Sequence, residues 1–155
     1  MPTLKHTDYC IINEPEAERT TGLQLSGING IIEENLPGVF RALRECGVSE
    51  GAVIHSKLAS YGVDAQGNYV RTTVYSVPRE AIVSTTDAGD AFCSGVLLGA
   101  FRSHTLGAAM KPGTLAANCS LLTAGASDGI GEIAEMEKQA AAWSPPETQV
   151  GKISL

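Results

Sequence analysis

The chain has 155 residues, 43% of them hydrophobic and 18% charged, which are the size and composition of one globular domain. The formal net charge is −6 and no dense stripe of Lys and Arg occurs, so nucleic acid is not an expected partner. No apolar run approaches the roughly 20 residues that cross a bilayer, and the first residues lack an apolar signal core, so neither a membrane segment nor secretion is expected.

Cysteine usage points to a reducing compartment. The four cysteines are Cys10, Cys46, Cys93 and Cys119. Each lies in an apolar stretch, and no two have CxxC spacing. This pattern favours four reduced thiols and predicts a cytoplasmic protein.

The first elements read as a strand followed by a helix. Residues 9–12 form a short apolar run that is typical of a buried strand. Asn13 follows as an expected N-cap, and Glu16 lies three residues later, which is the spacing of a capping box. Residues 22–30 are predicted to be a loop.

The next elements are a helix, a strand and a hairpin. A helix is expected from Pro37 to a C-cap at Gly47, because apolar residues recur there at helical spacing. Residues 52–54 read as a second buried strand. Residues 61–63 and 69–74 flank a polar turn and therefore predict a β-hairpin.

Helix signals dominate the second half. Helices are predicted over residues 87–101, 114–124 and 133–143, the last stopped by two prolines. The first of these helices carries a small residue at every fourth position, which allows close approach of another element. These small residues are Ala91, Gly95 and Gly99. Residues 144–155 form a tail to which the sequence assigns no structure.

The order of these elements predicts the fold class. Short apolar strands alternate with amphipathic helices, which favours an α/β layered fold with a mainly parallel sheet. The expected organisation is one domain over residues 1–155, with residues 144–155 as its tail.

Residues 84–92 form the most informative stretch, where a turn of small residues runs directly into a helix. The first N–H groups of a helix have no partner within it, so an anion can dock on them. Gly89 removes the Cβ that would obstruct this approach. Asp90 lies in the first turn, where a carboxylate can take a proton from an attacking hydroxyl.

The same stretch has a purely structural interpretation. Asp87 can serve as an ordinary N-cap, and Asp90 as an acid that complements the helix dipole. Local chemistry alone favours this interpretation over the catalytic one.

A family resemblance shifts the balance toward catalysis. Residues 84–92 resemble D-T-x-G-A-G-D-x-F, the C-terminal signature of the PfkB or ribokinase type of carbohydrate kinase. The matching positions are Thr85, Ala88, Gly89, Asp90 and Phe92. Residues 13–18 resemble the family's N-E-x-E-A-E segment, and residues 116–118 with 125–126 resemble the helix and loop beside the adenine. In all, the resemblance covers residue 8 to about residue 131.

The resemblance implies a ribokinase-like, three-layer α/β/α fold, of which this chain is an incomplete half, and a site for ATP and Mg²⁺. Asp90 would be the general base, in an anion hole formed by the amides of Ala88, Gly89 and Asp90. Asn13 and Glu16 would help to place Mg²⁺ through water. The remaining residues that the resemblance assigns to the nucleotide are Thr85, Asp87, Lys57, Ala117 and Asn118.

The sequence departs from the family pattern beside the expected phosphates. Asp87 occupies the position of a family glycine, and Ser84 that of a common aspartate. The family's T-x-G-x-x-G loop is represented by residues 55–60, which contain no glycine. Lys57 in this loop is more simply explained as a solvated lysine than as a phosphate ligand.

The family's N-terminal half, with its sugar-binding strands and lid, has no counterpart in this sequence. A sheet cut at that point would expose an apolar edge, so a homo-oligomer or a partner chain that supplies the missing half is expected. Two functions follow from the resemblance. The chain is either an ATP-dependent sugar or nucleoside kinase, or an inactive relative that binds a nucleotide or a protein.

Overall fold

The computed structural model of the protein describes residues 2–103, 105–125 and 127–155. Within the expected single domain, these residues divide into two compact units. The first unit runs from the N-terminus to Arg71 and includes Gln149–Leu155, and the second is Thr72–Thr148. Each unit has a hydrophobic core of its own.

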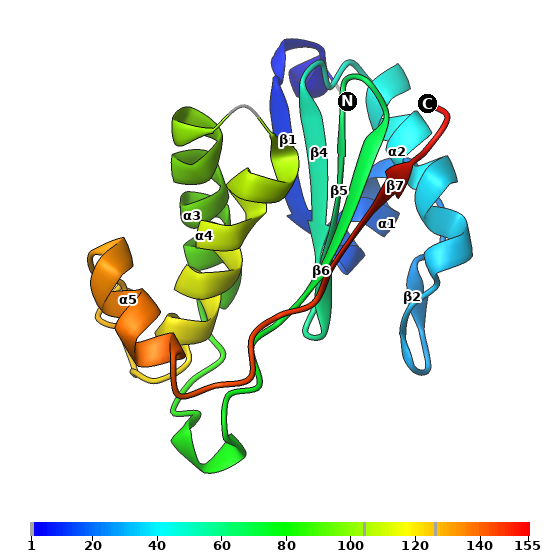
Figure 1. Ribbon diagram of the computed structural model, residues 1–155. Coiled ribbons are helices and arrows are strands. Elements are labelled where there is room, and N and C mark those ends of the chain that lie inside the picture. The colour runs from blue at the N-terminus through cyan, green and yellow to red at the C-terminus, as the bar shows by residue number, and fades with distance from the viewer. Residues whose placement is uncertain (1, 104, 126) are drawn as a thin grey trace. The chain divides into compact units, whose positions relative to one another are not determined.

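The first unit holds most of a five-stranded sheet with the strand order β1-β4-β5-β6-β7 (Figure 1). The strands are β1 Tyr9–Asn13, β4 Gly51–His55, β5 Ala59–Asp64, β6 Asn68–Thr73 and β7 Thr148–Lys152. β1 and β4 run parallel, whereas β4 and β5 run antiparallel. The expectation of a mainly parallel sheet is therefore wrong and the sheet is mixed. A short turn joins β4 to β5, and only a longer crossover would have kept the two strands parallel.

Two α-helices of the first unit pack beside this sheet. They are α1 Glu14–Thr21 and α2 Leu36–Glu45, and single 3-10 turns occur at Pro2–His6 and Glu33–Asn35. The apolar stripe expected on α2 is buried. Its members are Leu36, Val39, Phe40 and Leu43, none more than 1% exposed. This stripe forms a core with residues of β4 and β5, as its period of about 3.6 residues predicts.

Gly47 after α2 is a position where only glycine fits. Its φ is 116°, in the left-handed region, and a Cβ there would lie 2.6 Å from the Cα of Lys5. The C-cap of α2 is Cys46, one residue before the expected Gly47, and Gly47 is the left-handed glycine that lets the chain turn away from the helix.

Two segments of the first unit differ from expectation. The predicted loop 22–30 contains a small hairpin, β2 Ser26–Gly27 with β3 Gly30–Ile31. The Glu18 carboxylate accepts hydrogen bonds from the N–H groups of Leu25 and Ser26, and these bonds lower the pKa of Glu18. The tail, in turn, contains β7, a strand that the sequence did not predict. β7 lies beside β6, which is distant along the chain, and local patterns do not reveal such a partner.

The second unit is helical. It contains α3 Ala88–Arg102, α4 Leu106–Ser120, α5 Ile133–Ala140 and a 3-10 turn at Arg79–Ala81. α3 agrees with the predicted helix 87–101 to within one residue at each end. A Cβ on Gly99 would meet Ala109, and one on Gly95 would lie 2.6 Å from the Cα of Gly113. The two helices therefore run antiparallel in backbone contact along the predicted seam of small residues.

The other two helices were placed less well. α4 begins eight residues before the predicted 114–124 and ends at Ser120. Its start is fixed by Thr105, whose side chain accepts a hydrogen bond from the N–H of Ala108 at 3.3 Å. Pro112 lies inside the helix, and close packing against α3 offsets the hydrogen bond that the proline removes. α5 ends at Ala140 rather than 143, and Trp143 packs edge-on against Tyr75 at 5.9 Å between ring centroids.

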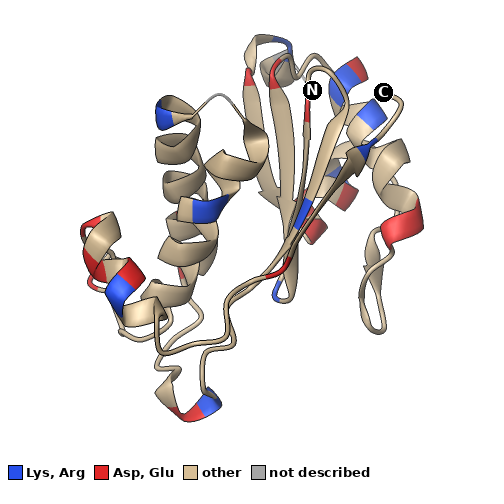
Figure 2. Cartoon of the chain, in the orientation of Figure 1, with Lys and Arg blue, Asp and Glu red and all other residues tan. Residues whose placement is uncertain are grey.

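In the described part of the chain, Lys and Arg are scattered along the elements and do not gather on one of them (Figure 2). None of the helices in the described ranges is long and apolar enough to cross a bilayer.

Candidate active site

The segment before α3 is held in place by the end of α4. The N–H groups of Val83 and Ser84 both donate to the carbonyl of Leu121, at 2.7 and 3.3 Å. Ser84 Oγ then accepts a hydrogen bond from the N–H of Thr86 at 3.1 Å. These bonds fix the approach to the helix. Nothing in the sequence singled out Leu121, because its contribution is a backbone carbonyl.

Asp87 adopts a left-handed backbone conformation at the start of α3. Its φ is 63° and its ψ is 4°, and among the described residues it is the only non-glycine with positive φ. Its carbonyl accepts the first helical hydrogen bond, from Ala91 at 3.0 Å, but its side chain caps no N–H group. Asp87 is therefore at the N-cap position without the capping bond that the sequence suggested.

The first turn of α3 contains backbone amides that have no acceptor within the described residues. They are the N–H groups of Ala88, Gly89 and Asp90. The Asp90 side chain is exposed and carries no hydrogen bond or ion pair there. An anion that docks on this turn would lie beside a carboxylate, which is the arrangement expected for phosphoryl transfer.

Two predicted nucleotide residues lie on α4, which packs against α3. Ala117 is half-buried and offers only a methyl group. The Asn118 side chain is buried and forms two hydrogen bonds with the backbone of Tyr75. Its Oδ1 accepts from the N–H of Tyr75 at 3.3 Å, and its Nδ2 donates to the carbonyl of Tyr75 at 3.4 Å. Asn118 therefore positions the segment that carries Tyr75. Of the loop resembling the adenine contact, Gly125 is described and Ala126 lies outside the described residues.

In the first unit, Asn13 and Glu16 form the predicted capping box. Asn13 Oδ1 accepts from the N–H of Glu16, and Glu16 Oε2 accepts from the N–H of Asn13, both at 2.9 Å. Within the described residues no group of three or more His, Cys, Asp and Glu side chains could hold a metal ion.

We expect Asn13→Ala to lower the free energy of unfolding by about 1 kcal/mol, because the capping bond to Glu16 is lost. Asn13→Asp keeps an acceptor and should leave stability within about 0.5 kcal/mol of the native protein. Urea unfolding followed by far-UV circular dichroism measures both. Equal stability of the alanine variant would contradict a stabilising role for this cap.

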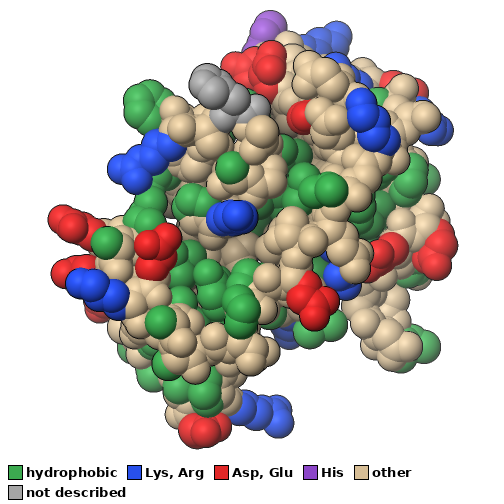
Figure 3. Space-filling view, viewed as in Figure 1, with side chains coloured by type: hydrophobic (Ala, Val, Ile, Leu, Met, Phe, Trp, Pro, Cys, Tyr) green, Lys and Arg blue, Asp and Glu red, His purple; other side chains and the backbone are tan. Residues whose placement is uncertain are grey.

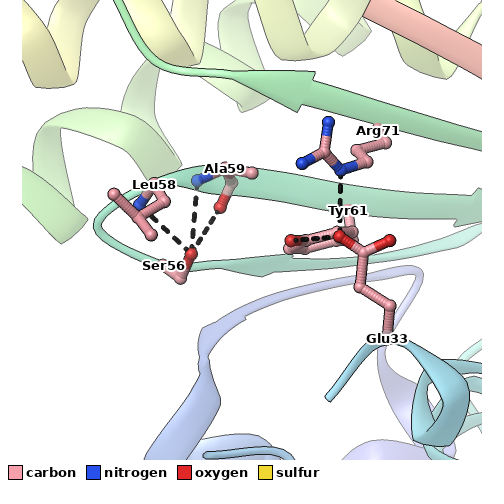
Figure 4. Close-up of polar contacts among 6 residues, drawn as sticks. All are labelled: Glu33, Ser56, Leu58, Ala59, Tyr61 and Arg71. Atoms are coloured by element: carbon pink, nitrogen blue, oxygen red, sulfur yellow. Dashed lines mark hydrogen bonds and ion pairs between the residues drawn. The ribbon is translucent and has the colours of Figure 1, made fainter. Parts of the chain in front are cut away.

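Residues 55–60 include a tight turn and do not form a glycine-rich phosphate-binding loop. Ser56 Oγ accepts from the N–H groups of Leu58 and Ala59, each at 3.3 Å, and donates to the Ala59 carbonyl at 2.9 Å (Figure 4). Lys57 at the tip of this turn is exposed. The loop's own hydroxyl thus satisfies amides that a glycine-rich loop would offer to phosphate.

A polar cluster beside this turn ties the hairpin to the segment before α2. Glu33 Oε1 accepts from the Tyr61 hydroxyl and from Arg71 Nε, both at 3.0 Å (Figure 4). Arg71 also stacks over the Tyr61 ring at 5.8 Å. Burial, followed by the hydrogen bond to Glu33, raises the pKa of Tyr61. These contacts give Glu33, Tyr61 and Arg71 a structural role that requires no ligand.

Comparison with known proteins gives one family. Residues 1–132 match the sequence model described as pfkB family carbohydrate kinase. No curated protein matches the chain. Its fold is similar to that of a protein described as a sugar kinase from Clostridium perfringens, with a TM-score of 0.78 and 14% identity over 97% of this chain and 44% of that one.

Two further structures are similar. Arabidopsis thaliana ribokinase, solved with ribose and ATP, has a TM-score of 0.73 and 18% identity, over 88% of this chain and 42% of its own. Sinorhizobium meliloti adenosine kinase has a TM-score of 0.69 and 22% identity, over 89% of this chain and 38% of its own. The chain thus spans less than half the length of these structures.

Proposed function

The chain belongs to the pfkB family of carbohydrate kinases, and from that premise we propose that the start of α3 is the catalytic segment of an ATP-dependent sugar or nucleoside kinase. The observation that carries this proposal is the first turn of α3, with its unpartnered amides beside the exposed Asp90. Asp90 takes the proton of the acceptor hydroxyl, and the amides of Ala88, Gly89 and Asp90 stabilise the negative charge on the transferred group. ATP supplies the phosphoryl group when bound.

Supporting roles are proposed for residues outside the first turn of α3. Thr85 and Asp87 precede the proposed phosphate position in sequence, Ala117 on α4 offers a small half-buried surface for the base, and Asn118 on α4 holds Tyr75. Glu16 would act on Mg²⁺ through water while its Oε2 accepts the hydrogen bond from the N–H of Asn13. Water-mediated binding suits Mg²⁺, which keeps several of its waters in kinase sites. Lys57, in the turn between β4 and β5, would contribute only its positive charge to nucleotide binding.

A second candidate, an inactive relative that binds a nucleotide or a protein, is favoured by Asp87. A carboxylate at this position repels phosphate where the family has glycine, and residues 55–60 offer no glycine loop. The two candidates differ in one observable, which is turnover at bound Mg-ATP.

Exposed apolar residues support a partner for the chain. On α3, Leu97 is 49% exposed, Leu98 37% and Phe101 89%. Apolar side chains also reach the surface on the face drawn in Figure 3. Such surface is uncommon on a soluble monomer, so we propose that a second copy or another chain covers part of it.

The test of catalysis is ADP formation from Mg-ATP with ribose or adenosine as acceptor. We expect Asp90→Asn to lower the rate by roughly 100-fold or more, since a general base contributes at least that factor. Glu135→Gln, which changes an exposed acid on α5 of the same unit, should leave the rate unchanged. An Asp90→Asn variant as active as the native chain would exclude Asp90 as the base. A native chain that binds Mg-ATP without turnover would establish the second candidate.

A further inference from the structure

Asp87 holds a backbone conformation that needs support from its surroundings. Its φ of 63° lies in the left-handed region, which residues other than glycine adopt only at a cost in free energy. Its side chain caps no N–H group, so no bond of its own offsets this cost. Such a conformation persists only where the neighbouring structure fixes it, and it is found often at functional sites. The hydrogen bonds on each side of Asp87 therefore show how the first turn of α3 is set in place.

These hydrogen bonds all lie within the second unit. On the helical side, the Asp87 carbonyl accepts from the N–H of Ala91 at 3.0 Å. On the other side, the N–H of Ser84 donates to the carbonyl of Leu121 at 3.3 Å, which ties the approach to the end of α4. The Ser84 hydroxyl oxygen then accepts from the N–H of Thr86 at 3.1 Å. The backbone is thus held immediately before and immediately after the left-handed residue.

Ser84 is the one residue of this arrangement that acts through its side chain. Within the described part of residues 83–91, the bond from Thr86 to Ser84 is the only hydrogen bond that involves a side chain, and the others join backbone groups. It closes a short turn in which a hydroxyl oxygen accepts from the N–H two residues later. This turn ends directly before Asp87. A substitution at Ser84 can therefore release the backbone on this side of Asp87 without touching α3 itself.

We propose that Ser84 is a positioning residue for the first turn of α3. Its hydroxyl oxygen holds Thr86, keeps Asp87 in the left-handed conformation and so fixes the amides of residues 88–90 before an anion arrives. A binding group that is already in place loses less conformational freedom when its ligand binds, so the bond strengthens phosphate binding. This inference rests on the proposed function, because those amides are the proposed phosphate site. Ser84 acts through the backbone and does not itself contact the phosphate.

The test is a titration of the full chain with inorganic phosphate, followed by the NMR shifts of the backbone amides of residues 88–90. We expect saturable shifts in the native chain. Ser84→Ala removes the acceptor, and the dissociation constant should rise by roughly threefold to tenfold, the effect of one neutral hydrogen bond. Ser84→Asn supplies a carboxamide oxygen that can accept from the same N–H, and it should restore the constant to within about twofold. Ser76→Ala, which changes an exposed serine of the same unit, should leave the constant unchanged.

A purely structural role of Ser84 would give a different result. It would lower the free energy of unfolding of Ser84→Ala and leave the phosphate constant of the folded protein unchanged, which overturns the proposal. An asparagine variant that binds no better than the alanine variant also overturns it, since the proposed contribution is an acceptor.

Failure of the proposed function has a separate signature in the same titration. If phosphate does not shift the amides of residues 88–90 in the native chain, the first turn of α3 is not an anion site, and the role of Ser84 falls with it. Circular dichroism checks that each variant is folded. Ser84→Cys, whose sulfur is only a weak acceptor, replaces Ser84→Ala if the alanine variant is not folded.

Discussion

Gly99→Ala is expected to lower the free energy of unfolding by about 2–3 kcal/mol. The added Cβ would meet the backbone of Ala109, whose Cα is 2.6 Å away. No side-chain rotation relieves this clash, because the obstructing atoms belong to the main chain of α4. The helices would have to separate along the whole seam, where Gly95 and Gly113 are also in contact. Alanine is a better helix former by about 1 kcal/mol, and this gain offsets only part of the loss.

Urea unfolding followed by tryptophan fluorescence measures the stability of the unit that contains Gly99. Trp143 is the only tryptophan and lies in the same unit as Gly99. Gly131→Ala is the matched control, since its Cβ would make only an ordinary contact, 3.5 Å from Glu135 Oε2. We expect the control to stay within about 0.5 kcal/mol of the native chain. A Gly99→Ala variant as stable as the control would mean that α3 and α4 are not in backbone contact.

The seam also shows which parts of the fold the sequence could predict. The spacing of Gly95 and Gly99 predicted close helix packing, and the pair Asn13 and Glu16 predicted the start of α1. Each is a local sequence pattern that is compatible with only one local structure. The parallel neighbours β1 and β4 were likewise visible as short apolar runs separated by two helices.

The elements that were missed depend on distant contacts. β7 is polar and exposed, and it becomes a strand only because β6 lies beside it. α4 contains Pro112 and Gly113, which weaken a helix locally, and its first half depends on the surface of α3. Tertiary packing overrides propensity in both cases.

The sequence predicted the turn and the helix start at residues 84–90, but not the conformation of Asp87 or the hydrogen bonds of Asn118. Residues 84–90 do form a turn into a helix, with Asp90 in the first turn. The expected side-chain cap by Asp87 is absent, and Asn118 is committed to the backbone of Tyr75. The glycine that the family has at the position of Asp87 is the signal that could have revealed the left-handed conformation. Glycine adopts positive φ without strain, and aspartate does not.

Asp87→Gly is therefore expected to strengthen Mg-ATP binding without a loss of stability. If ATP docks on the first turn of α3, the Asp87 carboxylate lies near its phosphates. Two like charges about 4 Å apart cost roughly 1 kcal/mol in water and about 4 kcal/mol at an effective dielectric near 20. Removing that repulsion should tighten binding by roughly one to three decades.

The stability of this variant follows from the backbone of Asp87. A non-glycine residue with φ of 63° is strained by about 1 kcal/mol, and glycine removes this strain. Glycine also gives the unfolded chain more freedom, which costs up to about 1 kcal/mol. No capping bond is lost, because the Asp87 side chain forms none. We therefore expect the free energy of unfolding to be unchanged or raised by up to about 1 kcal/mol.

Asp87→Asn separates the charge from the conformation. Asparagine tolerates the left-handed region about as well as aspartate but is neutral, so its stability should match that of the native chain. Calorimetric titration with Mg-ATP should then give tight binding for both variants and weak binding for the native chain. If Asn and Gly bind equally well, the charge alone suppresses binding. If only Gly binds, the Cβ at this position obstructs the phosphate. A native chain that binds as tightly as both variants would show that Asp87 does not act on the nucleotide, and the proposed position of the phosphates beside Ala88 and Gly89 would be wrong.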